Sequence, residues 1–208
     1  MSDRKQHWEN VYQQKSPHEV SWYQENPLLS LQLIQRCQLA PDAALIDVGG
    51  GASTLVDSLI NEAYTNITVL DVSEHALDHC KARLADRASS VEWFAQDITC
   101  FKPPHKFSLW HDRAVFHFLT SRSDREKYIN VLKQALEPGG QVIIMAFAID
   151  GPVKCSGLDI VQYDAEKLLA ELGSGFQLLE TGHDVHDTPT GNQQKFAFFR
   201  LSVNGEAF

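Results

Sequence analysis

Short apolar runs alternate with amphipathic stretches along most of the chain, and this alternation predicts strands and helices in turn. Residues 141–147 have the unbroken apolar character of a parallel strand that is covered on both faces. Shorter apolar runs at 44–48, 66–71 and 90–97 predict three further strands. The last two end in an acidic residue, which becomes important below.

Between these runs, apolar residues recur every three or four positions behind helix-capping residues. Helices are predicted over 4–14 and 53–63, and from Asp164 to near Gly173, while the turn 138–140 ends another helix. Pro27 suits the first position of the second helix. Asn26 is predicted to cap that second helix, with Leu28, Leu31 and Ile34 buried. Ser73 is predicted to cap a further helix, with Leu77, Cys80 and Leu84 buried. Ser123 forms a predicted capping box with Glu126 before a helix that buries Ile129, Leu132 and Leu136.

Strands that alternate with helices predict a doubly wound α/β sheet with right-handed crossovers. Residues 175–181 and 194–201 break the alternation, because they predict two consecutive strands joined by a loop that contains Pro and Gly. We therefore expect a mostly parallel sheet that a C-terminal antiparallel pair completes. With 208 residues, the chain is expected to form a single domain, 1–208.

The first strand runs directly into Gly49, Gly50 and Gly51, and a helix follows. Glycine accepts positive φ and has no Cβ, so a nucleoside-bearing ligand can lie against this loop. Asp71 ends the second strand 20 residues after Gly51, a spacing that suits a carboxylate holding the ribose hydroxyls. Asp97 follows the third strand, where it is a candidate to accept a hydrogen bond from an adenine amino group.

These residues resemble the class I S-adenosylmethionine-dependent methyltransferases, in particular the small single-domain type 12 members, over nearly the whole chain. Asp47, Gly49 and Gly51 match the first family motif, in which Ser53 replaces the third glycine. Residues 107–119 resemble the fourth strand with its following loop, and 138–140 the turn before the fifth strand. The resemblance implies a Rossmann-like seven-stranded fold and methyl transfer from S-adenosylmethionine, which becomes S-adenosylhomocysteine.

The resemblance also implies roles for individual residues of the cofactor site. Gly49 and Gly51 would cradle the methionine part, Asp71 would hold the ribose and Asp97 would read adenine. Residues 1–40 would fold over the cofactor as a helical lid on the core, 41–208. The full predicted cofactor set is Asp47, Gly49, Gly50, Gly51, Asp71, Val72, Asp97, Ile98 and His111, with Val72 and Ile98 on the two faces of the adenine ring.

Two other functions are compatible with parts of the pattern. Gly49, Gly51 and Thr54 nearly satisfy a dinucleotide fingerprint, which would indicate an NAD-type oxidoreductase. Asp47 opposes that interpretation, because a carboxylate repels a pyrophosphate but tolerates a sulfonium with its ammonium group. A non-catalytic regulatory protein that binds S-adenosylmethionine is the other alternative.

The acceptor side of the site carries weaker signals. His111 lies at the end of the predicted fourth strand and is a candidate general base, with a structural hydrogen-bonding role as the alternative. Asp112 and Arg113 are expected to pair with each other, unless they bind a charged substrate. His117 is expected to be packed and hydrogen-bonded. The aromatic residues Trp8, Tyr12, Trp22 and Tyr23, together with Arg113, form the predicted substrate and lid set, bordered by 155–157 and 186–189. The alternative role of the four aromatics is to anchor the first helix to the sheet, and the two roles are compatible.

The net charge, the apolar runs and the cysteine spacing limit the classes of partner and the location that we expect. The net charge of −9 disfavours general binding to nucleic acid phosphates, and no apolar run approaches the ~20 residues of a membrane span. The cysteines show no paired spacing, which favours reduced thiols and a cytoplasmic location. His75 with His79, and the segment 183–187, lack a matching third cluster, so we expect no metal. The acceptor is therefore expected to be a small molecule or a protein lysine.

Overall fold

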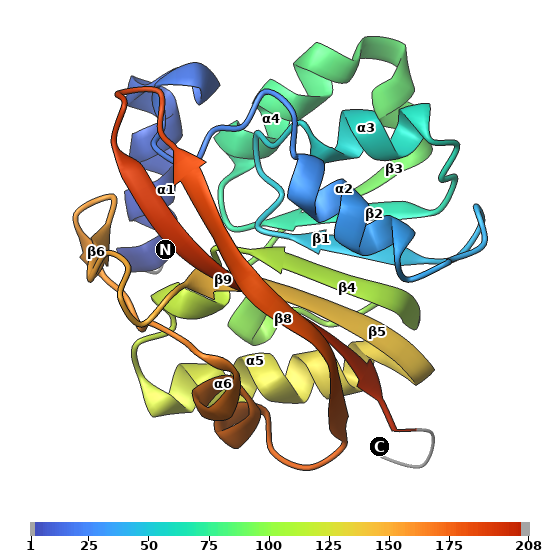
Figure 1. Ribbon diagram of the computed structural model, residues 1–208. Coiled ribbons are helices and arrows are strands. Elements are labelled where there is room, and N and C mark those ends of the chain that lie inside the picture. Colours follow the sequence, from blue (N-terminus) through green and yellow to red (C-terminus); the bar gives the residue numbers. More distant parts are fainter. Residues whose placement is uncertain (1–2, 205–208) are drawn as a thin grey trace.

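The computed structural model describes residues 3–204 and contains one seven-stranded sheet flanked by helices (Figure 1). The strand order is β3-β2-β1-β4-β5-β9-β8, and a separate pair is formed by β6 and β7. The strands are β1 Leu45–Val48, β2 Ile67–Asp71, β3 Val91–Ala95, β4 Phe107–Arg113, β5 Leu136–Phe147, β6 Lys154–Cys155, β7 Leu158–Asp159, β8 Phe176–Asp187 and β9 Gln193–Val203.

Six α-helices and four short 3-10 helices complete the described chain. Ser73 and Asp164 cap α4 and α6 as predicted, each accepting a hydrogen bond from a backbone N–H three residues ahead. The helices are α1 Asp3–Gln14, α2 Leu28–Gln35, α3 Leu55–Asn61, α4 Glu74–Leu84, α5 Arg122–Ala135 and α6 Ala165–Leu172, and the 3-10 helices are η1 Pro17–Glu19, η2 Ala85–Ser90, η3 Ile98–Cys100 and η4 Phe116–Phe118.

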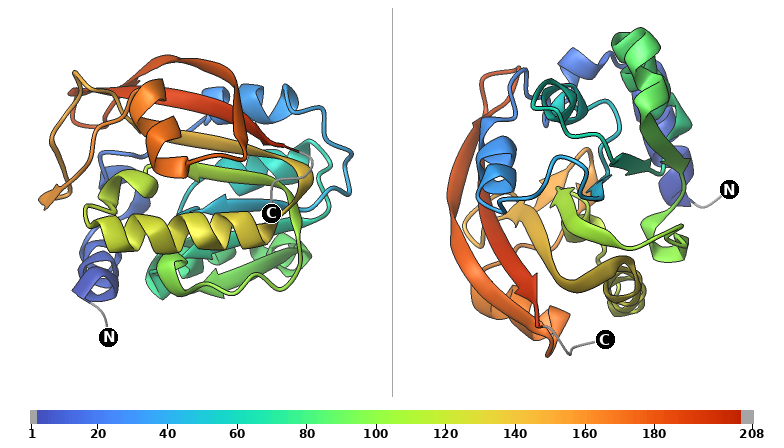
Figure 2. Two further views of the ribbon diagram at one scale, coloured as in Figure 1. Left: turned by 90° about the horizontal axis from the view of Figure 1, so that it is seen from below. Right: turned by 90° about the vertical axis from the view of Figure 1, so that its right-hand side faces the viewer.

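Both faces of the sheet are buried, as the continuous apolar runs predicted. Leu45 packs with the apolar residues of α2, α3 and α4, whereas the next residue, Ile46, packs with those of α5 and α6 on the other face. β1 to β5 are parallel neighbours in the sheet, and β9 joins β5 in antiparallel orientation. The long β8–β9 hairpin curves along one edge (Figure 2). The predicted α/β class and the antiparallel pair are confirmed.

Several predicted boundaries are wrong for local reasons. Ser121, not Ser123, caps α5, because its Oγ accepts from the N–H of Asp124 at 3.1 Å. Leu136 leaves the helix and pairs with Phe107, so the Pro-Gly-Gly segment 138–140 forms an irregularity inside β5 instead of a turn before it. β8 continues to Asp187 and includes residues 183–187.

The core face of α2 also differs from the prediction. Leu28 is 63% exposed, and the buried positions are Ser30, Leu33 and Ile34. Pro27 occupies the N-cap position, one residue before the first helical turn. A single hydroxyl on an otherwise apolar buried face needs a partner, and Ser30 finds one in the site described below. Among residues 3–204, no helix is both long and apolar enough to cross a membrane.

α1 is held against the first turn of α4 by a buried carboxylate. Glu9 accepts hydrogen bonds from Ser73 Oγ at 2.8 Å, from the N–H groups of Glu74 and His75, and from His75 Nδ1 at 2.7 Å. It therefore caps the first turn of α4 from another helix. Burial raises the pKa of Glu9, but these hydrogen bonds outweigh it and hold the pKa at about 2.

Replacing Glu9 by Gln is expected to lower the free energy of unfolding at pH 7 by about 1.5–3 kcal/mol, typical of hydrogen bonds to a charged group. The folded pKa lies below the ordinary value of 4.5, so the contribution is complete above pH 4.5 and is lost as the pH falls toward 2. Urea unfolding of both proteins at pH 7 and pH 3 measures the difference.

Glu74→Gln is the matched control, because Glu74 lies exposed in the same first turn of α4. We expect it to change stability by less than about 0.5 kcal/mol. Equal losses in the two variants at pH 7, or a Glu9 effect that persists undiminished at pH 3, would contradict this account of how α1 is held.

Candidate functional site

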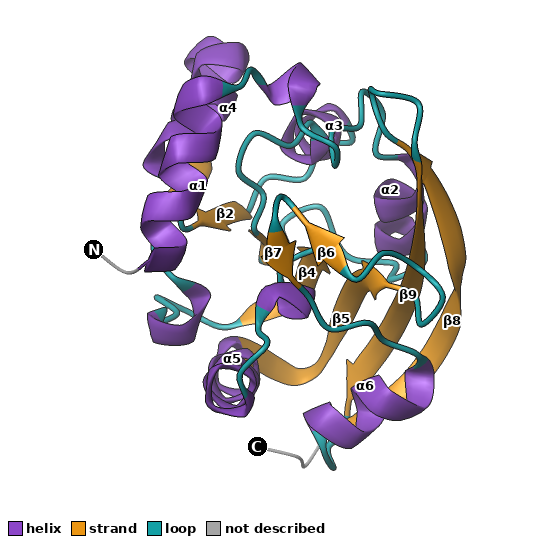
Figure 3. Ribbon diagram, turned by 90° about the vertical axis from the view of Figure 1, so that its left-hand side faces the viewer, coloured by secondary structure: helices purple, strands orange, loops and turns teal. Residues whose placement is uncertain are grey.

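The site lies at the carboxyl edge of the parallel strands, which Figure 3 shows face on, with α1 and the β6–β7 hairpin beside it. A cleft of about 810 Å³, its open mouth included, runs along this edge. A second cleft of about 550 Å³ adjoins it, and Tyr12, Trp22, Gly49 and Arg113 line both. The position is where doubly wound sheets bind ligands.

The glycine loop packs tightly against the acids at the strand ends. Gly49 and Gly51 have φ of 72° and 39°, in the left-handed region. A Cβ on Gly50 would lie 2.6 Å from an oxygen of Asp47, and one on Gly51 would lie 2.7 Å from an oxygen of Asp71. The loop must therefore be glycine because the acids occupy the space beside it. Gly49 faces both clefts and Gly50 the smaller one.

Asp71 is a buried carboxylate that lines the larger cleft. Its Oδ1 accepts the N–H of Ser73 at 2.8 Å. Burial raises its pKa to about 7, the hydrogen bond from Ser73 opposes the rise, and the negative charges of Asp47 and Glu9 add to it. A ligand that donates hydroxyl groups to this carboxylate would stabilise its ionised form.

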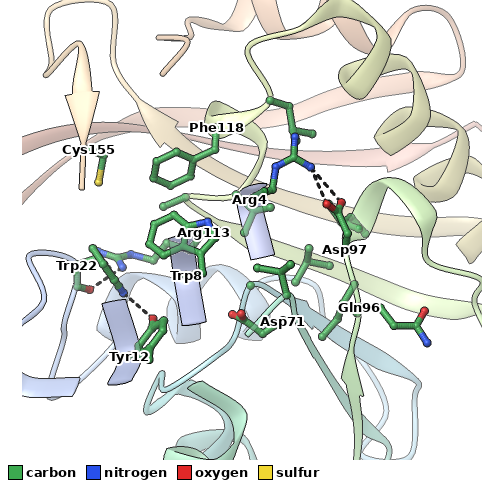
Figure 4. Close-up of a pocket in the computed structure, with 18 of the residues that line it drawn as sticks. Arg4, Trp8, Tyr12, Trp22, Asp71, Gln96, Asp97, Arg113, Phe118 and Cys155 are labelled. Carbon is green, nitrogen blue, oxygen red and sulfur yellow. Dashed lines mark hydrogen bonds and ion pairs between the residues drawn. The ribbon is translucent and has the colours of Figure 1, made fainter. Parts of the chain in front are cut away.

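Asp97 lines the same cleft but is already engaged (Figure 4). Arg4 of α1 donates from Nη1 to both carboxylate oxygens at 3.0 Å, and Oδ1 also accepts from the N–H and Oγ1 of Thr99. Among the described residues Oδ2 accepts only from Arg4, so it retains acceptor capacity. Val72 and Ile98 both line this part of the cleft. Arg4 could not be identified from the sequence, because it is an ordinary cation in the first turn of a polar helix.

Asp47 and His111 form a buried pair at the smaller cleft, and this pairing opposes a role of His111 as a catalytic base. His111 Nδ1 lies 2.7 Å from Asp47 Oδ1, and its Nε2 lies 3.0 Å from Ser30 Oγ. The imidazole is 1% exposed and does not line the larger cleft. With both ring nitrogens engaged, the arrangement favours the structural alternative, in which His111 orients Asp47.

Three of the four predicted lid aromatics meet over the larger cleft. Trp22 Nε1 donates to Tyr12 Oη at 3.1 Å, and Trp8 makes edge contacts with Trp22 and Phe118 at ring distances of 5.5 and 5.0 Å. Tyr23 does not join them, because it packs on His18 and lines only the smaller cleft. Phe118 was not predicted to line the cleft.

Asp112 and Arg113 do not pair, which corrects the expected ion pair. Alternate residues of a strand point to opposite faces. Asp112 accepts from the N–H groups of Val115 and Phe116 and from Tyr128 Oη at 2.6 Å. Arg113 points into the clefts, where Nη1 donates to the carbonyl of Trp22 at 3.0 Å.

The remaining predicted positions divide. Cys155 lines the larger cleft, whereas His186 and Thr188 do not and instead stabilise the β8–β9 end, His186 by a hydrogen bond with the carbonyl of Ser21. His117 is packed as expected, and its Nδ1 accepts the N–H of Phe147 at 3.4 Å, whereas its Nε2 has no hydrogen-bond partner among the described residues. The cleft also contains residues that the motifs did not indicate: Gln96, Leu119, Gln194 and Phe196.

The histidines considered for metal binding have other partners. His75 bonds Glu9, and His79 Nε2 lies 3.2 Å from the carbonyl of Tyr12. Within residues 3–204, no three His, Cys, Asp or Glu side chains lie close enough together to hold a metal ion.

Comparison with known proteins gives a consistent assignment. The family model described as a methyltransferase domain matches residues 46–142, from β1 into β5. The human EEF1A lysine methyltransferase 2 is 24% identical over 98% of this chain and 83% of its own length. The eEF1A lysine and N-terminal methyltransferase of Bos taurus is 25% identical over 66% of this chain, which spans only 19% of that longer protein.

The fold is shared with solved methyltransferases. The N-methyltransferase NodS from Bradyrhizobium japonicum WM9, in complex with S-adenosyl-l-homocysteine, superimposes with a TM-score of 0.69 at 18% identity, covering 94% of this chain and 97% of NodS. The family model, the relatives and the shared fold support the predicted family and enzyme class, a methyltransferase of the class I S-adenosylmethionine-dependent type.

Proposed function

We propose that the cofactor lies along the carboxyl edge of β1, β2 and β3, in the order in which these strands leave the sheet. Asp71 receives the ribose hydroxyls, Val72 and Ile98 cover the adenine ring, and Oδ2 of Asp97 accepts from its amino group. Gly49, Gly50 and Gly51 support the methionine part, whose ammonium group faces Asp47. The buried carboxylate of Asp71, with a pKa near 7 and room for donors, carries this proposal.

The bound cofactor supplies a methyl group on a positively charged sulfur. The protein's task is then to orient the acceptor and exclude water. His111 acts as a positioning residue, because its contacts with Asp47 and Ser30 fix the carboxylate at the smaller cleft. We assign the lid to the segment 1–40, because Arg4, Trp8 and Tyr12 of α1 line the larger cleft and Arg4 pairs with Asp97 and Asp124.

The acceptor that fits best is a small molecule enclosed beneath the lid. Trp8, Trp22 and Phe118 come from three separate segments and line the larger cleft, and the Trp8 ring contacts both of the others. His7 of α1 reaches the β6–β7 turn, with Nε2 3.4 Å from Ser156 Oγ. These contacts across the cleft favour a compact acceptor with an apolar body over an extended peptide.

The reduced cysteines are consistent with the cytoplasmic location that we propose.

A lysine side chain of a protein is the second candidate acceptor. The human relative named as a lysine methyltransferase supports it, since it matches nearly the whole chain. The guanidinium of Arg113 in the cleft opposes it, because a fixed positive charge repels an incoming ammonium group.

Replacing Asp71 by Asn is expected to weaken binding of S-adenosylhomocysteine about 10- to 100-fold, because hydrogen bonds to a charged group contribute about 1.5–3 kcal/mol. The wild-type affinity is expected to fall as the pH drops below 7, where Asp71 becomes protonated and loses acceptor capacity. The Asn variant has no such group. Titration calorimetry between pH 5.5 and 8.5 measures both effects.

Asp78→Asn, an exposed carboxylate on α4, serves as the control and should leave affinity and pH profile unchanged. If Asp71→Asn matched this control, the ribose assignment would be wrong. If the wild type bound neither S-adenosylmethionine nor S-adenosylhomocysteine but bound NAD tightly, the whole cofactor assignment would fail.

Incubating the protein with a lysate and methyl-labelled S-adenosylmethionine is expected to place the label in the small-molecule fraction, because the roofed cleft excludes a peptide. The Asp71→Asn variant provides the background rate. Label confined to protein lysines would instead establish the second candidate. Tight cofactor binding without methyl transfer to either fraction would favour the alternative of a non-catalytic regulatory protein.

A further inference from the structure

Arg113 has an unused hydrogen-bonding edge inside the cleft. Nη1 donates to the carbonyl of Trp22, whereas Nε and Nη2 are buried and have no hydrogen-bond partner among residues 3–204. These two nitrogens lie on the same side of the planar guanidinium, so their N–H bonds run parallel. That geometry matches the two oxygens of a carboxylate.

The charge of Arg113 is also without an ion-pair partner. Asp47 and Asp184 are near enough to raise its pKa, but neither lies within 4.0 Å, and no other described carboxylate does. Burial is the larger influence and lowers the pKa to about 10, so the group remains charged at neutral pH. A buried guanidinium that lacks a counter-charge is costly to the free protein, and an anionic ligand would relieve that cost.

The surroundings of Arg113 indicate the acceptor end of the cleft. The guanidinium carbon lies 5.1 Å from the centre of the Phe196 ring, and the charge of Arg113 acts on the Cys155 thiol. Both residues line the larger cleft and not the smaller one. Gln194 lines the same cleft, and its Oε1 is also a buried polar atom without a hydrogen-bond partner in the described chain.

We propose that Arg113 binds a carboxylate of the methyl acceptor through its Nε and Nη2 edge, and that Gln194 Oε1 accepts from a donor group on the same molecule. The acceptor class is thus a small carboxylic acid with an apolar or aromatic body, which the rings of Trp8, Trp22 and Phe196 enclose. This inference rests on the proposed transfer to a small molecule, and it adds the group by which that molecule is recognised.

Benzoate and benzamide are suitable probes, because they share shape and differ in charge. With the protein saturated by S-adenosylhomocysteine, we expect benzoate to bind at least 10-fold more tightly than benzamide. Arg113→Gln is expected to remove this preference, whereas Arg113→Lys retains the charge and should retain part of it. Arg122→Gln removes an exposed charge of the same sign and should have no effect. Titration calorimetry measures all four proteins.

The cofactor's own carboxylate is the competing partner for Arg113, and 5′-methylthioadenosine, which lacks the amino acid part, distinguishes it. If Arg113→Gln weakened binding of S-adenosylhomocysteine at least 10-fold but left 5′-methylthioadenosine unchanged, Arg113 would hold the cofactor and the inference would be overturned. Equal binding of benzoate and benzamide to the wild type, or no binding of benzoate, would overturn it as well.

The two levels of the assignment fail differently. Absence of S-adenosylhomocysteine binding in the wild type would remove the proposed cofactor site itself. Normal cofactor binding without a preference for benzoate would remove only the role of Arg113. Arg113→Lys keeps the test decisive if the Gln variant does not fold, because it preserves the buried charge and alters only the paired donor geometry.

Discussion

The site depends on the placement of buried carboxylates around a loop that has no side chains. Asp47 and Asp71 end neighbouring parallel strands, and each occupies the space that a Cβ of Gly50 or Gly51 would need. Buried carboxylates are unfavourable unless hydrogen bonds compensate them. Asp47 is compensated by His111, whereas Asp71 has one backbone N–H and a raised pKa. The unequal compensation leaves Asp71 as the acid with capacity for a ligand.

The same principle explains how the N-terminal segment is attached. Glu9 of α1 is fully used by the first turn of α4, and Arg4 of the same helix is used by Asp97 and Asp124. The contacts of Glu9 anchor α1 to α4, whereas Arg4 binds Asp97, the carboxylate that is predicted to recognise adenine. The segment is therefore fixed to the scaffold and also supplies residues to the wall of the larger cleft, as the proposed lid requires.

Most of the cofactor side was predictable because it depends on strand ends and glycines, which local sequence reports well. Asp47, Asp71 and Asp97 meet at one edge for the reason that parallel strands end together. The acceptor side was less predictable, because its walls come from distant segments. Nothing near Phe196 or Gln194 marks them as cleft residues, and Arg4 is an ordinary helix cation. Ser30 did carry a signal, as the lone hydroxyl on the buried face of α2. Asp112 and Arg113 were misjudged because sequence adjacency suggested contact, whereas strand geometry directs them to opposite faces.

The β8–β9 hairpin contributes to the larger cleft independently of the glycine loop, and this separation affects how the site can change. Phe196 and Gln194 belong to an antiparallel strand that has no part in the glycine loop or in the acids of β1 and β2. In the arrangement that we propose, a substitution at Gln194 or Phe196 alters the cleft wall beside Arg113 and leaves the glycine loop and the acids of β1 and β2 unchanged. Point changes in a single hairpin would then alter which acceptor is bound without altering how the donor is bound.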